Sequence, residues 1–457
     1  MRTLITLVLL TIFTSACQNE KKHNMEQTPR TFQMPEWAKN AVIYEVNIRQ
    51  FTPEGTINAL SDHIPRLKAL GVDILWLMPV FPISETKRKG SLGSYYAVSD
   101  FKSVNPEFGT IEDLKNLIDK IHAYKMKVIF DWVPNHTGWD HTWIKSNPDF
   151  YTKGPDGQIT DPLDPNTGQP YGWSDVADLN YNNPDMRKAM ISDLLHWVNN
   201  YKIDGYRMDI AFGVPLDFWK TCADTLMDAN PELFLLAEAE MPEQLNENTF
   251  HACYGWSFFH TMNAVAKGEK NVSHIRHWLE TERPKFKKGS IMHFITNHDE
   301  NSWNGTEFER MGQGYRAFAI LAMTFDGIPL IYSGQEEPLT KRLKFFEKDT
   351  IPFEKFSNSD FYSTLNALKH QEEAMWNEPY GAPMQLIGKS DHILAYKREK
   401  NNSKVVIMLN LSDQKRKITL DEGFEGMLDI YRRIDVGFVQ GAEVEMLPWE
   451  SWVMIKK

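Results

Sequence analysis

The sequence predicts a (β/α)8 barrel with an inserted subdomain after its third strand and a small C-terminal antiparallel β domain. Three observations support this prediction. From residue 41 onward, short apolar runs alternate with amphipathic stretches of helical period, which is typical of parallel β/α folds. A long polar segment, 137–180, interrupts the alternation after the third run. Beyond about residue 375, the pattern changes to alternating strands separated by turns.

Eight apolar runs are the candidate barrel strands, and the sixth has the weakest pattern. They lie at residues 41–48, 73–80, 127–133, 205–211, 233–240, 253–260, 291–298 and 329–334. Helical patterns such as "TIEDLKNLIDKIHAYK" and "PDMRKAMISDLLHWVNNY" lie between them and begin with Thr or Pro, as helices often do. Eight such units favour a closed barrel. A doubly wound open sheet is the alternative, but no Gly-rich phosphate loop follows any strand.

These patterns divide the chain into a barrel and a terminal domain. The barrel covers residues 36–375 and includes the inserted subdomain, 137–180, which is rich in Pro, Gly, Asp, Asn and Trp. Long ordered loops in compact domains tend to be functional, so we expect this subdomain to border a site. Runs such as "SKVVIMLNLSD" and "WESWVMIKK" predict a C-terminal β-sandwich domain over residues 376–457.

The N-terminus has the pattern of an export signal. Arg2 precedes an apolar run, 4–13, which is too short to span a bilayer, and small residues then lead to Cys17 in "TSAC". This predicts a lipoprotein signal peptide over residues 1–17, lipidation of Cys17 and a polar linker over 18–35. We expect an exported protein held at a bacterial membrane, periplasmic or at the cell surface, by this lipid only. An ordinary signal peptide is the alternative.

Composition excludes some functions. Acidic residues outnumber basic ones by 61 to 50, and the formal net charge is −11, so nucleic acid is not an expected partner. Only Cys222 and Cys253 remain after the signal, which excludes a disulfide scaffold and leaves at most one bridge. Cys222 lies on a predicted helix, where a buried thiol is the better interpretation.

Polar residues gather at the ends of four predicted strands. In a barrel of this kind, the C-terminal ends of the strands and the following loops form the mouth that holds the working residues. The side chains found there are Asp131, Asn135, His136, Arg207, Asp209, Glu238, Glu240, Asn297, His298, Asp299 and Glu300.

These side chains indicate glycosidic bond chemistry. Carboxylates occur there without a dedicated Ser or Cys nucleophile and without a His/Cys metal cluster, and glycosidases use a carboxylate pair. Arg207 and Asp209 point to the same side of an extended strand because they are two residues apart. We therefore expect Arg207 to keep Asp209 ionised, while a less solvated carboxyl retains its proton.

Four separated blocks resemble the α-amylase family of glycoside hydrolases over residues 36–457. They are "DWVPNH" (131–136), "GYRMDIA" (205–211), "LLAEAE" (235–240) and "FITNHD" (294–299), in the family's order. The stretch "GSYYAVSDFKSVNPEFGT" (93–110) resembles the family's tyrosine block, and "VADLN" (176–180) resembles its short block in the inserted domain.

The resemblance implies a role for each matching residue. Asp209 is the expected nucleophile, Glu238 the general acid/base, and Asp299 the carboxylate that holds sugar hydroxyls in the transition state. Glu240 is the rival for the acid, but Glu238 occupies the family's position. The expected residues around the sugar are Tyr96, His136, Arg207 and His298.

The resemblance also implies a retaining reaction through a covalent glycosyl intermediate on Asp209. The expected partners are α-1,4-linked glucans, namely maltodextrins, cyclodextrins or starch fragments, and the chemistry needs no cofactor. A transglycosylase or an α-1,6-acting relative is the alternative among enzymes. A sugar-binding protein without activity is the alternative from another class, and it predicts loss of a carboxylate that this chain retains.

The chain departs from the family just after the nucleophile. Phe212 and Gly213 stand where many members have Lys and His. Phe212 therefore predicts an apolar subsite, and Gly213 weakens the case for structural calcium, for which Asn135 and Asp178 are the candidate ligands. Flat aromatic rings suit sugar faces, and the candidates for such contacts are Trp139, Trp143, Tyr171, Trp173 and Trp303.

Overall fold

A computed structural model of the chain describes residues 32–164 and 167–457. Residues Gln33–Lys457 form one compact unit. The predicted signal peptide, 1–17, and most of the predicted linker, 18–35, lie outside the described residues. Within the described ranges, none of the helices combines the length and the apolar character needed to cross a membrane.

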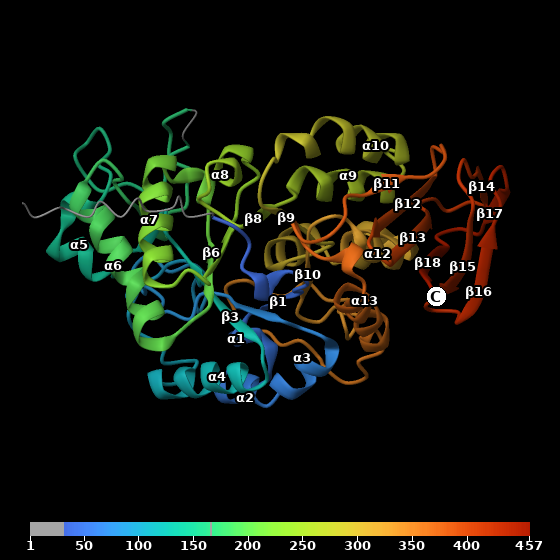
Figure 1. The fold of residues 1–457 in the computed structure, drawn as a ribbon. Coiled ribbons are helices and arrows are strands. Elements are labelled where there is room, and N and C mark those ends of the chain that lie inside the picture. Colours follow the sequence, from blue (N-terminus) through green and yellow to red (C-terminus); the bar gives the residue numbers. More distant parts are fainter. Residues whose placement is uncertain (1–31, 165–166) are drawn as a thin grey trace, which may run out of the picture. The chain divides into compact units, whose positions relative to one another are not determined.

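Eight parallel strands close into a barrel, which confirms the predicted fold and excludes the open sheet (Figure 1). Around the barrel the order is β1, β2, β3, β6, β7, β8, β9, β10 and back to β1. Their bounds are β1 (Ile43–Val46), β2 (Ile74–Leu77), β3 (Lys127–Trp132), β6 (Gly205–Met208), β7 (Phe234–Ala237), β8 (Ala252–Tyr254), β9 (Ser290–His293) and β10 (Ile328–Tyr332).

Helices alternate with these strands as the sequence pattern predicts. Thr110 begins α4 with a capping box that it forms with Asp113, and Asn183 caps α6 ahead of Pro184. The helices are α1 (Ile48–Phe51), α2 (Ile57–Ser61), α3 (Ile64–Leu70), α4 (Ile111–Ala123), α5 (Thr142–Ser146), α6 (Pro184–Tyr201), α7 (Leu216–Ala229), α8 (Pro242–Asn246), α9 (Trp256–Ala266), α10 (Val272–Thr281), α11 (Glu307–Met311), α12 (Tyr315–Thr324) and α13 (Ser359–Gln371).

The sixth predicted strand, 253–260, is largely wrong. Only Ala252–Tyr254 is β8, and the chain then enters α9, which buries Phe258 and Phe259. A short apolar run rich in aromatic residues does not distinguish a strand from a buried helix, because both bury it completely. The barrel nevertheless has the eight predicted strands, because the short β8 occupies the sixth position.

Alternate residues of the strands point into the barrel. Along β1 and β3, these inward side chains change from apolar to charged towards the mouth. Ile43 and Ile129 belong to the apolar cluster inside the barrel. Two residues further along the same strands lie Glu45 and Asp131, and Arg207 occupies the matching position of β6, paired in register with Asp131. These three charged side chains are fully buried. The end of the barrel nearest the mouth is therefore polar, and this layer supports the site.

The inserted subdomain and the C-terminal domain are both built on antiparallel strands. In the subdomain, β4 (His136–Gly138) pairs with β5 (Val176–Asp178). The C-terminal domain has a six-stranded sheet in the order β11-β12-β13-β18-β15-β16 and a two-stranded sheet, β14-β17, which share one apolar core. Its strands are β11 (Gln385–Leu386), β12 (Ile393–Lys400), β13 (Ser403–Asn410), β14 (Arg416–Thr419), β15 (Phe424–Asp429), β16 (Ile434–Phe438), β17 (Glu443–Met446) and β18 (Ser451–Lys456).

Arg398 of β12 joins the C-terminal domain to the barrel. Its guanidinium is buried and donates hydrogen bonds to the carbonyl oxygens of Thr324 (3.3 Å) and Phe325 (2.9 Å), at the end of α12. It also donates to the carbonyl oxygens of Ala382 (2.8 Å) and Trp376 (2.9 Å). Burial lowers the pKa of Arg398 to about 10, so it remains charged at neutral pH.

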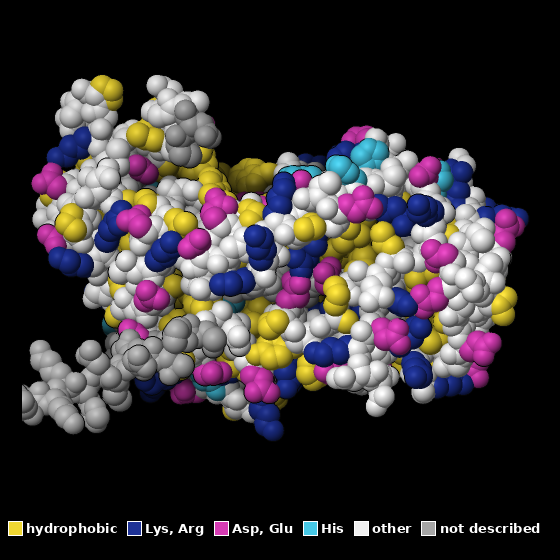
Figure 2. Space-filling model, turned by 45° about the horizontal axis from the view of Figure 1, so that its top comes forward, with side chains coloured by type: hydrophobic (Ala, Val, Ile, Leu, Met, Phe, Trp, Pro, Cys, Tyr) yellow, Lys and Arg dark blue, Asp and Glu magenta, His cyan; other side chains and the backbone are white. Residues whose placement is uncertain are grey.

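Acidic and basic side chains are interspersed over the face of the molecule drawn in Figure 2. On that face, the described residues form no continuous basic patch. This distribution agrees with the composition, which disfavours nucleic acid as a partner.

Candidate active site

A cleft of about 560 Å³ lies at the mouth of the barrel. Six of the seven predicted site residues line it, and the seventh, Arg207, is fully buried against two of them. The lining residues are Lys89, Ser94, Tyr96, His136, Trp173, Asp175, Val176, Asp209, Ile210, Phe212, Glu238, His298, Asp299, Trp303, Phe345 and Phe346.

Arg207 holds three carboxylates at once. Its Nη1 lies 2.8 Å from Asp131 Oδ1 and 2.8 Å from Asp209 Oδ1, and its Nη2 lies 3.0 Å from Glu238 Oε2. Its Nε donates to the Tyr254 hydroxyl at 3.2 Å. A planar guanidinium fixes the direction of each partner, so the predicted nucleophile and the predicted acid share one rigid support.

The backbone turns sharply just after Asp209. Ile210 has a φ of 44°, in the left-handed region that a β-branched residue rarely adopts, and its N–H donates to Glu238 Oε2 at 2.7 Å. Strain of this kind tends to occur at functional sites, where the surrounding structure enforces it. Through this hydrogen bond, the backbone turn after Asp209 helps to position the Glu238 carboxylate.

Arg207 does not give Asp209 a low pKa in the free protein, so that expectation is wrong. Burial and the neighbouring Glu238 raise the pKa of Asp209 well above its ordinary value, although Arg207 lowers it. Burial likewise raises the pKa of Asp131 to about 6 against the opposing effect of Arg207. The physical reason is that one guanidinium faces three buried carboxyl groups. Such a cluster retains a proton, which a reaction with one acid and one nucleophile requires.

His298 connects the third carboxylate to the barrel interior. Its Nδ1 lies 2.5 Å from Glu45 Oε1, and its Nε2 lies 2.8 Å from the Tyr96 hydroxyl and 3.3 Å from Asp299 Oδ2. Burial lowers the pKa of His298, but Asp299 and Glu45 outweigh it and raise this pKa to about 9. The ring is therefore a charged donor at neutral pH.

Tyr96 and His136 present rings to the cleft. Tyr96 stacks on His298, with ring centroids 5.6 Å apart and an interplanar angle of 25°, and its hydroxyl donates to Asp131 at 3.0 Å. Burial lowers the pKa of His136 to about 3, so its ring is neutral. Tyr96 thus offers a fixed flat face, and His136 offers an uncharged hydrogen-bonding group.

Glu240, the rival acid, does not line the cleft. Its carboxylate accepts hydrogen bonds from the Ser257 N–H at 2.7 Å and the Ser257 hydroxyl at 2.5 Å. The geometry therefore favours Glu238.

The model of the family described as "Alpha amylase, catalytic domain" matches residues 12–386. The chain belongs to the α-amylase family. "Alpha-amylase MalA" of Haloarcula japonica is 26% identical over 421 residues, which cover 87% of this chain and 59% of that protein. The chain thus spans less than two thirds of that relative's length. "Cyclomaltodextrinase" of Thermoanaerobacter pseudethanolicus is 25% identical over 458 residues, which cover 88% of this chain and 75% of that protein.

Solved structures agree on the fold. A crystal structure of "a noncanonic maltogenic alpha-amylase AmyB from Thermotoga neapolitana" matches with a TM-score of 0.82 and 24% sequence identity. The match covers 92% of this chain and 99% of that one. At this identity the likeness concerns the fold, including both the barrel and the C-terminal sheet.

In this α-amylase family chain, two of the five candidate aromatic residues line the cleft. These two are Trp173 and Trp303. The Trp173 ring stacks on Tyr171, with ring centroids 4.6 Å apart, and Trp303 is 52% exposed. Trp143 instead packs against Phe150 at 5.4 Å inside the subdomain. Trp139 lies outside the cleft as well, beneath the Lys87 ammonium. Phe212 lines the cleft and is 45% exposed, as an apolar subsite requires.

The predicted set omitted several residues that the structure places at the family's site. Glu45, which supports His298, was not predicted at all, whereas Asp131, which supports Arg207, was predicted at the mouth without a role. A signal for both existed, because each is a carboxylate within an apolar strand. Phe345 and Phe346 line the cleft from the loop after β10, where no sequence pattern distinguishes them from other loop aromatics.

The side chains predicted to hold calcium form an incomplete ligand set. A Cβ atom at residue 213 would lie 2.6 Å from Asn135 Oδ1, so Gly213 leaves room for Asn135. Burial, with Asp161 nearby, raises the pKa of Asp178 to about 7. Among the described residues, no group of three or more His, Cys, Asp or Glu side chains is placed to hold a metal ion. Calcium prefers six to eight oxygen ligands, so these side chains alone do not suffice.

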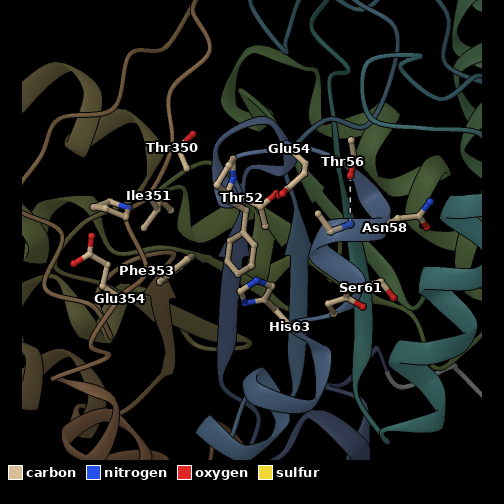
Figure 3. Close-up of a pocket in the computed structure, with 15 residues that line it drawn as sticks. Thr52, Glu54, Thr56, Asn58, Ser61, His63, Thr350, Ile351, Phe353 and Glu354 are labelled. Carbon is tan, nitrogen blue, oxygen red and sulfur yellow. Dashed lines mark hydrogen bonds between the residues drawn. The ribbon is translucent and has the colours of Figure 1, made fainter.

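A wider cavity of about 860 Å³ lies elsewhere, between the loop after β1 and residues 350–354 (Figure 3). Thr52, His63 and Phe353 line it, but none of the predicted catalytic residues does. We therefore place the active site in the smaller cleft, where the carboxylates meet.

Protonation of His298 is expected to make stability depend on pH. Because its folded pKa, about 9, exceeds its ordinary value of 6.5, its contribution is complete below pH 6.5 and is lost as the pH rises through 9. The contribution is at most on the order of 3 kcal/mol. Thermal melting at pH 6.5 and pH 9.5 should show a larger decrease in Tm for the native protein than for His298→Gln. Equal decreases would contradict the assignment.

Proposed function

We propose that the protein is a retaining glycoside hydrolase that cleaves α-1,4-glucosidic bonds in maltodextrins, cyclodextrins or starch fragments. The observation that carries the proposal is the pairing of the buried Arg207 guanidinium with both Asp209 and Glu238 as ion pairs. Membership of the α-amylase family supports the same substrate class, and so do the printed names of the relatives.

In the first step, the proton of the carboxyl cluster lies on Glu238, and an Asp209 carboxylate oxygen attacks the anomeric carbon of the bound sugar. The bond from that carbon to the glycosidic oxygen breaks, and Glu238 gives its proton to this oxygen. The aglycone leaves, and the glycone remains as an ester on Asp209. Arg207 keeps both carboxyl groups in place during this exchange.

In the second step, the Glu238 carboxylate takes a proton from water, and the water oxygen attacks the anomeric carbon. The ester bond breaks, Asp209 regains its carboxylate, and the configuration is retained. Asp299 accepts hydrogen bonds from sugar hydroxyls, and its carboxylate charge stabilises the positive charge that develops at the anomeric carbon. The charged His298 ring donates a hydrogen bond that orients the sugar. The flat Tyr96 ring supports the sugar face.

A panel of substrates tests the proposal. The purified protein should be incubated with maltoheptaose, β-cyclodextrin, pullulan and isomaltose, and the products resolved over time. Products from the α-1,4-linked substrates, released with the α configuration at early times, are the expected result. Cleavage of isomaltose alone would move the assignment to α-1,6 linkages, and binding without products would favour a sugar-binding protein.

Structural calcium near Asn135 and Asp178 remains a prediction that needs backbone carbonyl oxygens to complete the ligand set. If calcium binds, a chelator should lower the Tm by several degrees and added calcium should restore it, because a ligand of the folded state stabilises it. An unchanged melting curve would remove the metal from this account.

We further propose that the protein is exported and held at a bacterial membrane by a lipid on Cys17, which the "TSAC" pattern supports. Expressed in a bacterium that processes lipoproteins, the native chain should fractionate with membranes, and Cys17→Ser should shift it to the soluble fraction. Recovery of both forms in the soluble fraction would favour an ordinary signal peptide.

A further inference from the structure

Three loops at the mouth of the barrel join into a continuous wall along one side of the cleft. Lys89, in the loop after β2, forms an ion pair with Asp175 of the inserted subdomain at 2.7 Å, and both line the cleft. Ser91 lies two residues further along the same loop. Its N–H donates at 2.9 Å to Oε1 of Glu347, which lies in the loop after β10. The Leu92 N–H also donates to the Phe346 carbonyl oxygen, at 3.0 Å.

Aromatic rings continue this wall towards the segment after β9. Trp303 lies 5.8 Å from Phe346 and 5.2 Å from Phe345 between ring centroids. Phe345 in turn stacks on Tyr96 with an interplanar angle of 16°. We name this belt, from Asp175 through Lys89 and Phe346 to Trp303, the glycone wall.

The glycone wall is braced from behind by α1, the short helix that follows β1. The buried Arg49 donates to the carbonyl oxygens of Leu92 and Gly93 at 3.1 Å each. Gly90 lies where the loop after β2 meets the loop after β10. A Cβ atom at residue 90 would lie 2.5 Å from Phe346 Cβ, so only glycine allows this contact, and Gly90 has a φ of 64°. These contacts make the wall a fixed part of the site.

The order of the barrel strands gives the orientation of the substrate relative to this wall. Asp209 and Glu238 follow β6 and β7, whereas the central part of the wall, with Lys89 and Phe346, is built from the loops after β2 and β10, on either side of β1 across the barrel. The anomeric carbon must lie beside Asp209, and the leaving group must lie beside Glu238. The opposite end of the same sugar, with its 4-hydroxyl, therefore faces the glycone wall.

We propose that the glycone wall closes the non-reducing side of the cleft and makes the protein act from the non-reducing ends of linear α-glucans, with release of a mono- or disaccharide. This inference rests on the proposed function and narrows it. A chain that continued beyond the wall would have to break the ion pair or displace Phe346, whereas the side near Phe212 and Glu238 stays available for the rest of the substrate. Cyclodextrins, which have no chain end, should react more slowly than maltoheptaose.

Two forms of maltoheptaose test this inference. Both carry an aryl label at the reducing end, and one also carries an acetal that blocks the 4- and 6-hydroxyls of the terminal glucose. The native protein should cleave the free form at least about tenfold faster than the blocked form, as measured by kcat/KM from chromatographed products. Phe346→Ala and Lys89→Ala should each raise the relative rate on the blocked form.

Phe353→Ala is the matched control, because Phe353 lies in the same loop but lines the separate cavity (Figure 3). It should leave the ratio of the two rates unchanged. Equal cleavage of both forms by the native protein would overturn the inference and leave the hydrolase assignment intact. Cleavage of neither form would overturn the proposed function and this inference with it. If a wall variant does not fold, the ratio for the native protein still decides the result.

Discussion

Asp209→Asn is expected to lower kcat on maltoheptaose by at least about a thousandfold while the Tm stays close to that of the native protein. An amide of the same shape cannot attack the anomeric carbon, yet it can still accept a hydrogen bond from Arg207, which lies 2.8 Å from the carboxylate. The steady-state rate and the melting curve should be measured on the same preparation. A pure Asp209→Asn protein with full activity would refute the nucleophile assignment.

Glu238→Gln should give a comparable loss on maltoheptaose but a different result on an aryl glucoside. A good leaving group needs no proton, so the first step should proceed and the ester on Asp209 should accumulate, which intact-mass spectrometry would detect. Glu240→Gln is the matched control, because Glu240 lies two residues away and is bound to Ser257 instead of facing the cleft. It should retain activity. If Glu240→Gln were inactive and Glu238→Gln active, the acid would have been assigned to the wrong carboxylate.

Arg207→Met is expected to destabilise the fold by about 3–5 kcal/mol and to abolish activity. Methionine fills most of the space, but it leaves Asp131, Asp209 and Glu238 facing one another in a buried layer without the guanidinium that pairs with all three. Chemical denaturation of the native and variant proteins at neutral pH measures this free energy of unfolding.

The pH dependence of the stability lost in Arg207→Met distinguishes an electrostatic cause from a packing cause. The carboxyl groups of Asp131 and Asp209 already have raised pKa values in the native protein, and removal of the guanidinium raises them further. More of these carboxyl groups are then protonated at pH 5 than at pH 8, so the difference in unfolding free energy between native and variant proteins should be smaller at pH 5 than at pH 8. Asp131→Asn combined with Arg207→Met should recover part of the loss. A loss that is the same at both pH values would indicate a packing effect.

Local sequence patterns predicted most of the fold. The alternation of apolar runs and helical stretches placed the barrel strands, and the position of polar residues at strand ends located the mouth. The Arg207 and Asp209 pair was predicted to share a face because strand geometry alone determines that relation. Glu45 carried the same kind of signal within "AVIYEVNI", and it should have been included in the predicted site.

The remaining features depend on contacts between distant residues. Ser91 meets Glu347 only after the barrel has closed, so no local pattern indicates that these loops join or that Phe346 reaches the cleft. The raised pKa of Asp209 has the same origin, because it depends on burial and on Glu238 from another strand. The sixth strand was overextended because periodicity cannot separate a buried strand from a buried helix.

The attachment of Arg398 limits how far the chain can be shortened. Its guanidinium supplies partners for the carbonyl oxygens of Thr324 and Phe325, which a helix terminus cannot satisfy internally. A protein cut before β12 would have to hydrate these groups and the apolar surface around them, which would favour fraying of α12 and self-association. We therefore expect a protein cut before β12 to be less stable than the full chain.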